Sequence, residues 1–247
     1  MRMIKKSLAA ALLLSSALTV QAGERLTLLT ENYPPFNMSV DDRNFARGIE
    51  VEGISTDIIR EMVKRANIEA TFTLRFPWSR IYNQTLKKPN YAIFSTARSA
   101  EREPLFQWVG PVVDNDYVLF TMAKSNLTIN TIEDLKKYKV GAYKDDYVSQ
   151  LLKSKGIEVI ETPEDSYNAT KLEQGRIDVW ASGSLSGPYN AGKVGVTNIK
   201  QIYVVESKGL HLAFNKQTPV NVIKKLQTTL DAIKADGTAA AIHKRYQ

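Results

Sequence analysis

The side chains that most often carry out covalent or metal chemistry are scarce in this chain. The sequence contains no cysteine, which excludes disulfides, thiolate metal sites and a cysteine nucleophile. His211 and His243 are its two histidines, and they lie far apart without an acidic or histidine partner at helical spacing. A zinc site or a serine–histidine–aspartate triad is therefore not expected. We predict that the chain uses no metal and no cofactor.

Stretches typical of strands alternate with stretches typical of helices along the chain. Apolar or β-branched runs predict strands at residues 25–30, 69–76, 91–96, 117–123, 140–144, 159–161, 177–181 and 202–205. Apolar positions at helical spacing and capping residues predict helices from residue 54, over 79–88, from 131, over 147–155, from 163 and from 219. The polar segment 37–53 is predicted to be a loop. This order is typical of an α/β fold with largely parallel sheets, but it does not show whether there are one or two lobes.

The first 22 residues have the layout of a secretory signal. Arg2, Lys5 and Lys6 make a positive start, an apolar run of about 11 residues follows, and small residues end the segment at Ala22. A membrane-spanning helix needs roughly 20 apolar residues, so an uncleaved anchor is the less favoured alternative. We predict a signal peptide at residues 1–22 and a mature protein that begins at Gly23.

The composition of the mature chain argues against several classes of partner. Removal of the signal lowers the formal charge from +7 to +4. Such a modest charge, without a clustered basic stripe, is not typical of nucleic-acid binding. The absence of cysteine also rules out a lipidated cysteine after the signal, so no membrane anchor is expected. We predict a freely soluble, periplasmic and monomeric protein.

Seven short motifs occur in the order and at the spacing of a known family. They are Glu31–Phe36 (ENYPPF), Ser99–Arg102 (SAER), Phe106–Pro111 (FQWVGP), Glu133–Leu135 (EDL), Val140–Gly141 (VG), Gly175–Asp178 (GRID) and Asp236–Thr238 (DGT). On these residues the chain resembles the bacterial periplasmic solute-binding proteins of the amino-acid-binding type, family 3 of the ABC transporters. The resemblance implies a periplasmic binding protein fold of two α/β lobes with two interlobe crossings. It places residues 23–112 and 210–247 in lobe 1 and residues 113–209 in lobe 2.

The resemblance also implies which side chains of lobe 1 bind the ligand. Arg102 aligns with the family's carboxylate-binding arginine, and a guanidinium can donate two charge-assisted hydrogen bonds to a carboxylate. Arg98, four residues earlier, is an alternative or an additional contact. Either arginine could instead form a surface ion pair. Ser95 and Thr96 lie where the family places a hydroxyl and backbone donors, with capping of the turn as the alternative role.

Aromatic side chains are implied to cover the ligand. Tyr33 matches the ring that stacks over the ligand in the family, with packing against the neighbouring prolines as the alternative. Trp78 lies near a second family aromatic, and Arg80 close by is a candidate contact particular to a subfamily. Such rings would exclude water from the apolar part of a ligand.

Lobe 2 departs from the family pattern. Amino-acid binders usually carry an acidic residue five positions after the Asp of the GRID-type motif, where it holds the α-ammonium group. Here that position is Gly183, beside the candidate hydroxyl of Ser182. Asp145 or Asp146 is the candidate substitute for the missing carboxylate, although both could simply cap the helix that follows. The departure leaves open whether the ligand is a standard α-amino acid.

Three functions are compatible with these residues. A binding protein that captures a small polar ligand, such as an amino acid or a related carboxylate or amine, for an inner-membrane ABC permease works by lobe closure and needs no nucleophile–base pair. A dehydratase-like enzyme on the same fold would need a cleft carboxylic acid, and Glu173 is the candidate by position. A ligand receptor for a membrane sensor is the third function. We predict the binding protein, without enzymatic activity.

Overall fold

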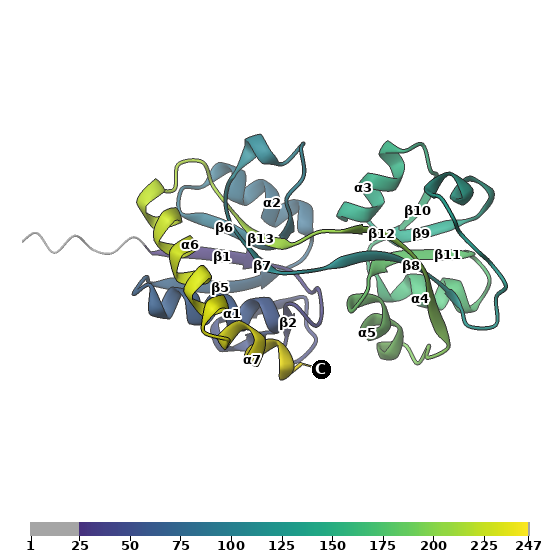
Figure 1. Ribbon diagram of the computed structural model, residues 1–247, viewed down its shortest axis with the longest axis horizontal. Coiled ribbons are helices and arrows are strands. Elements are labelled where there is room, and N and C mark those ends of the chain that lie inside the picture. The colour runs from purple at the N-terminus through teal and green to yellow at the C-terminus, as the bar shows by residue number, and fades with distance from the viewer. Residues whose placement is uncertain (1–24, 247) are drawn as a thin grey trace, which may run out of the picture.

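The computed structural model describes residues 25–246, so the predicted signal peptide at 1–22 and the predicted start at Gly23 lie outside the described residues. Figure 1 shows two lobes side by side, each built around a sheet. The sheet of lobe 1 has the strand order β3-β5-β1-β6-β13-β7, and that of lobe 2 has the order β10-β9-β11-β8-β12. The predicted two-lobed α/β fold is confirmed, but the expectation of largely parallel sheets is wrong, because five of the nine strand pairings in these two sheets are antiparallel.

Lobe 1 surrounds its sheet with helices from both ends of the described chain. Its main strands are β1 (Leu26–Thr30), β3 (Phe45–Arg47), β5 (Ala70–Arg75), β6 (Tyr91–Ala97), β7 (Gln107–Val113) and β13 (Leu210–Phe214). A small sheet pairs β2 (Met38–Ser39) with β4 (Val51–Glu52). The helices are α1 (Ile54–Arg65), α2 (Trp78–Lys87), α6 (Val220–Ala235) and α7 (Thr238–Lys244), with 3-10 turns η1 (Gly48–Glu50) and η2 (Glu103–Leu105).

Lobe 2 is formed by the middle of the chain. Its strands are β8 (Asp116–Met122), β9 (Val140–Tyr143), β10 (Val159–Thr162), β11 (Val179–Gly183) and β12 (Ile199–Ser207). Its helices are α3 (Tyr147–Ser154), α4 (Ser166–Glu173) and α5 (Ser186–Lys193), with the 3-10 helix η3 (Ile132–Lys137). Strands β9, β10 and β11 are parallel, whereas β8 and β12 pair antiparallel. The ends of the three parallel strands therefore meet at one edge of the sheet.

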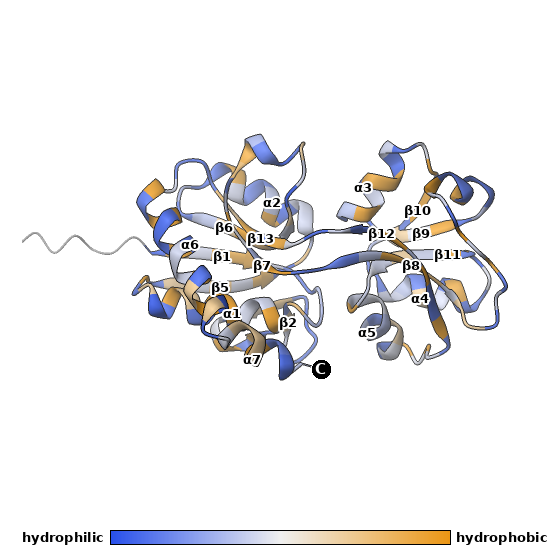
Figure 2. Ribbon diagram, viewed as in Figure 1, coloured by the Kyte–Doolittle hydropathy of each residue, from blue (hydrophilic) through white to orange (hydrophobic). Residues whose placement is uncertain are grey.

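Each lobe buries apolar side chains on both faces of its sheet. In lobe 1, β1 and β5 pack against α1 and α6, while Leu29 and Ile93 pack with Ile81 of α2 on the other face. In lobe 2, α3 covers one face, and α4 and α5 cover the other around the fully buried Trp180. Figure 2 shows hydrophobic residues along the strands and hydrophilic stretches where the chain crosses between lobes. The periodic apolar positions of the sequence therefore correspond to these buried faces.

Two short segments connect the lobes. Residues 114–115 join β7 to β8, and residues 208–209 join β12 to β13 (Figure 1). The backbone N–H of Lys208 donates to the carbonyl oxygen of Asn115 at 2.8 Å, so the two crossings are tied to each other. Two adjacent crossings of this kind suit a hinge. The lobe limits that the resemblance implies, at 112/113 and 209/210, stay a prediction.

Several elements differ from the sequence-based expectations. The segment 37–53 is not wholly a loop, because it contains β2, β3, η1 and β4. The strands among them form by pairing with other strands, as where Phe45 of β3 lies opposite Arg75 of β5. The local sequence pattern does not show such pairing. The helix expected from 131 is a 3-10 helix, the one expected from 163 begins only at Ser166, and the one expected from 219 begins at Val220. Helices α5 and α7 were not among the expected elements.

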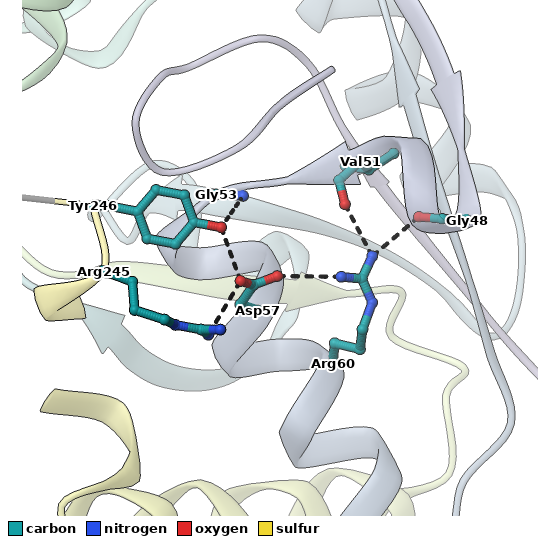
Figure 3. A network of polar contacts seen from close by, with 7 residues as sticks. All are labelled: Gly48, Val51, Gly53, Asp57, Arg60, Arg245 and Tyr246. Atoms are coloured by element: carbon teal, nitrogen blue, oxygen red, sulfur yellow. Dashed lines mark hydrogen bonds and ion pairs between the residues drawn. The ribbon is translucent and has the colours of Figure 1, made fainter. Parts of the chain in front are cut away.

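A polar network holds the end of the described chain against α1 (Figure 3). Asp57 of α1 accepts hydrogen bonds from Arg60 at 3.2 Å, from Arg245 at 3.3 Å and from the hydroxyl of Tyr246 at 2.8 Å. The same Tyr246 hydroxyl accepts the backbone N–H of Gly53 at 3.0 Å. The final described turn and the start of α1 are thereby fixed together.

The start of α1 in turn positions the loop that carries Tyr33. The backbone N–H groups of Ile54 and Ser55 donate to the carbonyl oxygens of Pro35 and Phe36 at 2.9 and 2.8 Å. Gly53 makes this approach possible, because a Cβ there would lie 2.5 Å from the oxygen of Phe36. Its φ of +119° also lies in the region that favours glycine. Lobe 1 therefore holds the Tyr33 loop rigidly at the edge of the cleft.

Candidate ligand-binding site

Two adjacent cavities lie between the lobes. The first, of about 30 Å³, is lined by Glu31, Tyr33, Asn37, Trp78, Phe94, Ser95, Ala97, Arg102, Tyr117, Tyr143, Asp145, Asp146 and Tyr147. The second, of about 200 Å³, shares Glu31, Tyr33, Tyr143 and Asp146 with the first and adds Asn32, Pro34, Asp42, Asn44, Phe76, Pro163, Glu164, Asp165, Ser166, Asn190 and Lys193. Glu31, Tyr143 and Asp165 follow or end β1, β9 and β10. This is the carboxyl edge of parallel strands, where open α/β sheets bind ligands.

Arg102 provides the positive charge of the first cavity. Arg102 is only 6 % exposed, and its Nη1 atom donates a hydrogen bond to the carbonyl oxygen of Ala97 at 3.3 Å. The guanidinium carbon lies 5.9 Å from the ring centres of both Trp78 and Tyr82. Within residues 25–246 it forms no ion pair. Its remaining donors are therefore available to an anionic group in the cavity.

Glu31 links the two lobes from the floor of both cavities. The hydroxyl of Tyr143, from lobe 2, lies 3.0 Å from each carboxylate oxygen of Glu31, from lobe 1. Burial raises the pKa of Glu31 to about 8, and the negative charges of Asp146 and Asp145 act in the same direction. Hydrogen bonds from Tyr143 and from the backbone of Trp78 only partly offset this rise. The surroundings of Glu31 disfavour the ionised form of its carboxyl group. Carboxyl groups with such raised pKa values are typical of functional sites.

Asp145 and Asp146 both line the first cavity from lobe 2. Asp146 occupies the N-cap position of α3, although no side-chain capping hydrogen bond forms there, so its position supports cavity lining more directly than helix capping. Burial raises the pKa of Asp146 to about 6, and the charge of Asp165 adds to the rise. Arg102 and the backbone N–H groups of the first turn of α3 lower this pKa. A cationic group in the cavity would favour the ionised form of Asp146.

Asp165 supplies a further carboxylate at the second cavity. Its Oδ1 accepts hydrogen bonds from Trp180 Nε1 at 2.8 Å and Asn168 Nδ2 at 3.0 Å. Its Oδ2 accepts from Ser182 Oγ at 2.6 Å and, more weakly, from Asn190 Nδ2 at 3.4 Å. Burial raises the pKa of Asp165, whereas these four donors lower it. The predicted site residue Ser182 therefore points its hydroxyl at Asp165 and is not among the residues that line either cavity.

Gly183 is required by the side chain of Tyr33. The Tyr33 hydroxyl reaches across from lobe 1, where it accepts a hydrogen bond from Asn115 Nδ2 at 3.3 Å. A Cβ at position 183 would lie 2.6 Å from this hydroxyl. The position at which the resemblance implied a carboxylate therefore has no space for a side chain while the Tyr33 hydroxyl lies here.

We expect Gly183→Ala to weaken ligand binding at least several-fold, because the new methyl group displaces Tyr33 from the closed cleft. The measurement is equilibrium titration of the purified variant with the ligand of the wild-type protein. Gly192→Ala is the matched control, since a Cβ at that helical position meets no atom within 4 Å. Equal affinity in both variants would show that Tyr33 does not need this space.

Two buried polar atoms at the first cavity have no hydrogen-bond partner within residues 25–246. They are the hydroxyl of Ser95 and the Oδ1 atom of Asn37. Asn37 is 1 % exposed, and its amide nitrogen is already used by the carbonyl oxygen of Glu31. Buried polar atoms without partners are costly, so a ligand that forms hydrogen bonds with these two atoms would be favoured in this cavity.

The predicted site residues fall into two groups. The cavities bring together Tyr33, Trp78, Ser95, Arg102, Asp145 and Asp146. Arg98 points elsewhere, because Nε and Nη2 bind both carboxylate oxygens of Glu103 at 2.5 and 2.6 Å. Arg80 is exposed, and Thr96 is buried with its hydroxyl on the carbonyl oxygen of Ile93. Neither residue lines a cavity, so their binding roles stay predictions without support from this geometry.

Sequence reasoning missed Glu31, Asn37, Tyr143 and Asp165 as cavity residues. Each one comes from a separate part of the chain, and three of them follow or end a strand. That position was the available signal, because ligands collect at the ends of parallel strands. Across the described chain, no group of three or more His, Asp or Glu side chains could hold a metal ion.

The comparisons with known proteins agree with this architecture. The family model of the bacterial extracellular solute-binding proteins, family 3, matches residues 26–247. The chain belongs to this family. Two Escherichia coli (strain K12) proteins are each 27% identical to it, over 98% and 95% of this chain and 99% and 96% of their own lengths. The second of them is named ABC transporter arginine-binding protein 1.

Solved structures share the fold of this solute-binding protein. A histidine kinase sensor domain with similarity to periplasmic binding proteins has a TM-score of 0.79 at 16% identity, covering 91% of this chain and 96% of its own. An ancestral arginine-binding protein bound to arginine has a TM-score of 0.74 at 19% identity, with 90% and 97% coverage. These structures bear on the fold alone, and it is the family match over residues 26–247 that confirms the resemblance to solute-binding family 3. Within residues 25–246, no helix has the length and apolar character needed to cross a membrane.

Proposed function

We propose that this solute-binding protein captures an amino acid with a cationic side chain, such as arginine, and delivers it to an inner-membrane ABC permease. The observation that carries the proposal is the charge balance of the cleft. Across the two cavities, the cationic side chains of Arg102 and Lys193 are outnumbered by carboxyl groups, those of Glu31, Asp42, Asp145, Asp146, Glu164 and Asp165, and Lys193 is already paired with Asp42. An amino acid with a neutral side chain would need one cationic and one anionic group of the cleft, for its carboxylate and its ammonium group. The surplus of carboxyl groups favours a ligand with a further positive charge.

The residues of the first cavity have distinct roles in this proposal. Arg102 binds the α-carboxylate through its free donors, and Asp146 opposite binds the α-ammonium group. Trp78 and Tyr33 cover the apolar part of the ligand. Ser95 and Asn37 complete the hydrogen bonding of the polar groups. Because Arg102 belongs to lobe 1 and Asp146 to lobe 2, one ligand would hold the two lobes together.

Closure of the lobes would confine the ligand. Besides the Tyr143–Glu31 contact, Lys193 of lobe 2 forms an ion pair of 2.5 Å with Asp42 of lobe 1 at the rim of the second cavity. In the arrangement described here the first cavity, at about 30 Å³, has space for little more than a water molecule. A ligand bound between Arg102 and Asp146 therefore needs the lobes further apart than they are here, and its contacts with both lobes would favour a closed form that stops short of this arrangement.

The structure offers little to the dehydratase-like alternative. Glu173, the candidate acid, lies at the exposed end of α4 and lines neither cavity. His211 bonds through Nδ1 to the carbonyl oxygen of Gly209 and packs against Trp108. We therefore propose a binding protein without enzymatic activity, acting as a monomer in the periplasm. The arginine-binding relatives support the same ligand class.

A thermal-shift screen tests the proposal. The ligand-free protein is heated with arginine, lysine, ornithine, citrulline, glutamine, glutamate and putrescine. A ligand at 100 times its Kd adds about 2.7 kcal/mol to the free energy of unfolding, which raises the melting temperature by several degrees. We expect shifts from the basic amino acids and not from glutamate. A shift from glutamate alone, or turnover of a ligand, would contradict the proposal. Loss of arginine uptake in a deletion strain would separate transport from sensing.

A further inference from the structure

Asp165 is the one carboxyl group of the second cavity that combines a fixed position with an uncompensated charge. Its two oxygens are fully occupied by four neutral donors, from Trp180, Ser182, Asn168 and Asn190. These donors keep the side chain ordered and favour its ionised form, against the effect of burial, which raises the pKa of Asp165. No Lys or Arg forms an ion pair with it in the described part of the chain. Lys193 lines the same cavity but is paired with Asp42.

The charged groups follow an order from one cavity to the next. Arg102 lines only the first cavity, Glu31 and Asp146 line both, and Asp165 lines only the second. A ligand whose carboxylate binds Arg102 and whose ammonium group binds Asp146 would extend its side chain past Glu31 into the second cavity. That cavity measures about 200 Å³, which leaves space for such an extension. Its far end would then lie beside Asp165.

The donors to Asp165 also explain how lobe 2 keeps a negative charge without a carboxylate at position 183. Ser182 Oγ, from the neighbouring position, binds Asp165 Oδ2 at 2.6 Å. The carboxylate therefore comes from the loop between β10 and α4 and is held against the end of β11. In this position the Asp165 carboxylate does not occupy the space beside Gly183, which the Tyr33 hydroxyl fills.

We propose that Asp165 is a specificity-determining residue, whose fixed negative charge selects ligands with a cationic side chain in the second cavity. The inference rests on the proposed function, because it assumes an amino acid bound through Arg102. Since all four of its hydrogen-bonding positions are filled within the protein, Asp165 acts on the ligand through its electrostatic field. At an effective dielectric constant of about 20, a charge at several ångströms still changes affinity on the order of ten-fold or more.

The test compares arginine with citrulline, which has nearly the same shape but a neutral side chain. Both ligands are titrated into the wild-type protein, Asp165→Asn and the control Asp178→Asn, at low ionic strength. Asp178 is a lobe 2 carboxylate that accepts a backbone hydrogen bond from Lys139 at 2.8 Å and lines neither cavity. We expect Asp165→Asn to lower the ratio of arginine to citrulline affinity on the order of ten-fold. The control should leave this ratio unchanged.

A second variant covers the case that Asp165→Asn disturbs folding. Asn190 and Asp165 are in contact and both line the second cavity. The double variant Asp165→Asn/Asn190→Asp exchanges the two residues and so moves the negative charge from position 165 to position 190. We expect it to restore much of the discrimination. An unchanged ratio in folded Asp165→Asn, or an equal loss of both ligands, would overturn the proposal in favour of a structural role. Failure of both variants to fold would overturn it too. If the wild-type protein binds neither ligand, the proposed function itself fails.

Discussion

Replacing Arg102 with alanine is expected to lower the affinity for the ligand by about 2–5 kcal/mol, the typical cost of removing one partner of a buried charge pair. This corresponds to about 30-fold or more, since each 1.4 kcal/mol is a factor of ten. The side chain is 6 % exposed, and its free donors face a cavity lined by carboxyl groups of both lobes. The measurement is calorimetric titration of the folded variant with the ligand found by screening.

Arg98→Ala is the matched control for this prediction. Arg98 lies four residues earlier, is exposed, and is paired with Glu103 outside both cavities. Its replacement should leave ligand affinity within a factor of about two, because exposed ion pairs contribute little. Full affinity in Arg102→Ala, or a large loss in Arg98→Ala alone, would show that the anionic group of the ligand binds elsewhere.

Replacing Glu31 with glutamine is expected to raise the melting temperature of the ligand-free protein at pH 8 while weakening its binding of a basic amino acid. Burial raises the pKa of Glu31 from a usual value of 4.5 to about 8. The folded protein therefore holds one proton more than the unfolded chain between these values. Its stability falls as the pH rises through this window. Glutamine resembles the neutral carboxyl group and removes that dependence.

A cationic ligand should reverse the preference of Glu31 for its neutral form. Binding would then release protons, so affinity for arginine should rise between pH 6 and pH 8 in the wild-type protein and rise less in Glu31→Gln. The pKa of about 6 for Asp146 should leave part of the rise near pH 6 in the variant. Glu173→Gln, an exposed change, is the control. The same pH profile in wild type and Glu31→Gln would remove Glu31 from the ligand's charge balance.

The sequence predicts the fold well because the fold depends on buried faces. The apolar positions of α1, at Ile58, Ile59 and Met62, show helical spacing and are all buried against β1 and β5. Asp236 and Gly237, from the DGT motif, separate α6 from α7, and Gly237 there has a φ of +81°. Strands β3, β7 and β13 were missed. The first two are edge strands whose structure depends on pairing with a distant strand, whereas β13 lies inside the sheet, and its buried apolar run was not recognised as a strand.

The candidate site was only partly predictable because motifs locate single residues and not their partners. The SAER motif led to Arg102 through the resemblance, but it left Arg98, four residues earlier, as an alternative or additional contact. The structure separates the two, because within residues 25–246 Arg98 forms an ion pair with Glu103 whereas Arg102 forms none. Asp165 carries no motif at all. Its importance follows from four donors that come together only when β10, β11, α4 and α5 are folded.

The central claim is that the cleft between the lobes binds a basic amino acid through Arg102 and the facing carboxyl groups. Calorimetric titration of the ligand-free wild-type protein with arginine, in two buffers of different ionisation enthalpy at pH 7, tests it most directly. The account predicts saturable binding of one arginine per chain, accompanied by release of protons from Glu31 and Asp146. Binding without proton release, or no binding of arginine, lysine or ornithine, would contradict it.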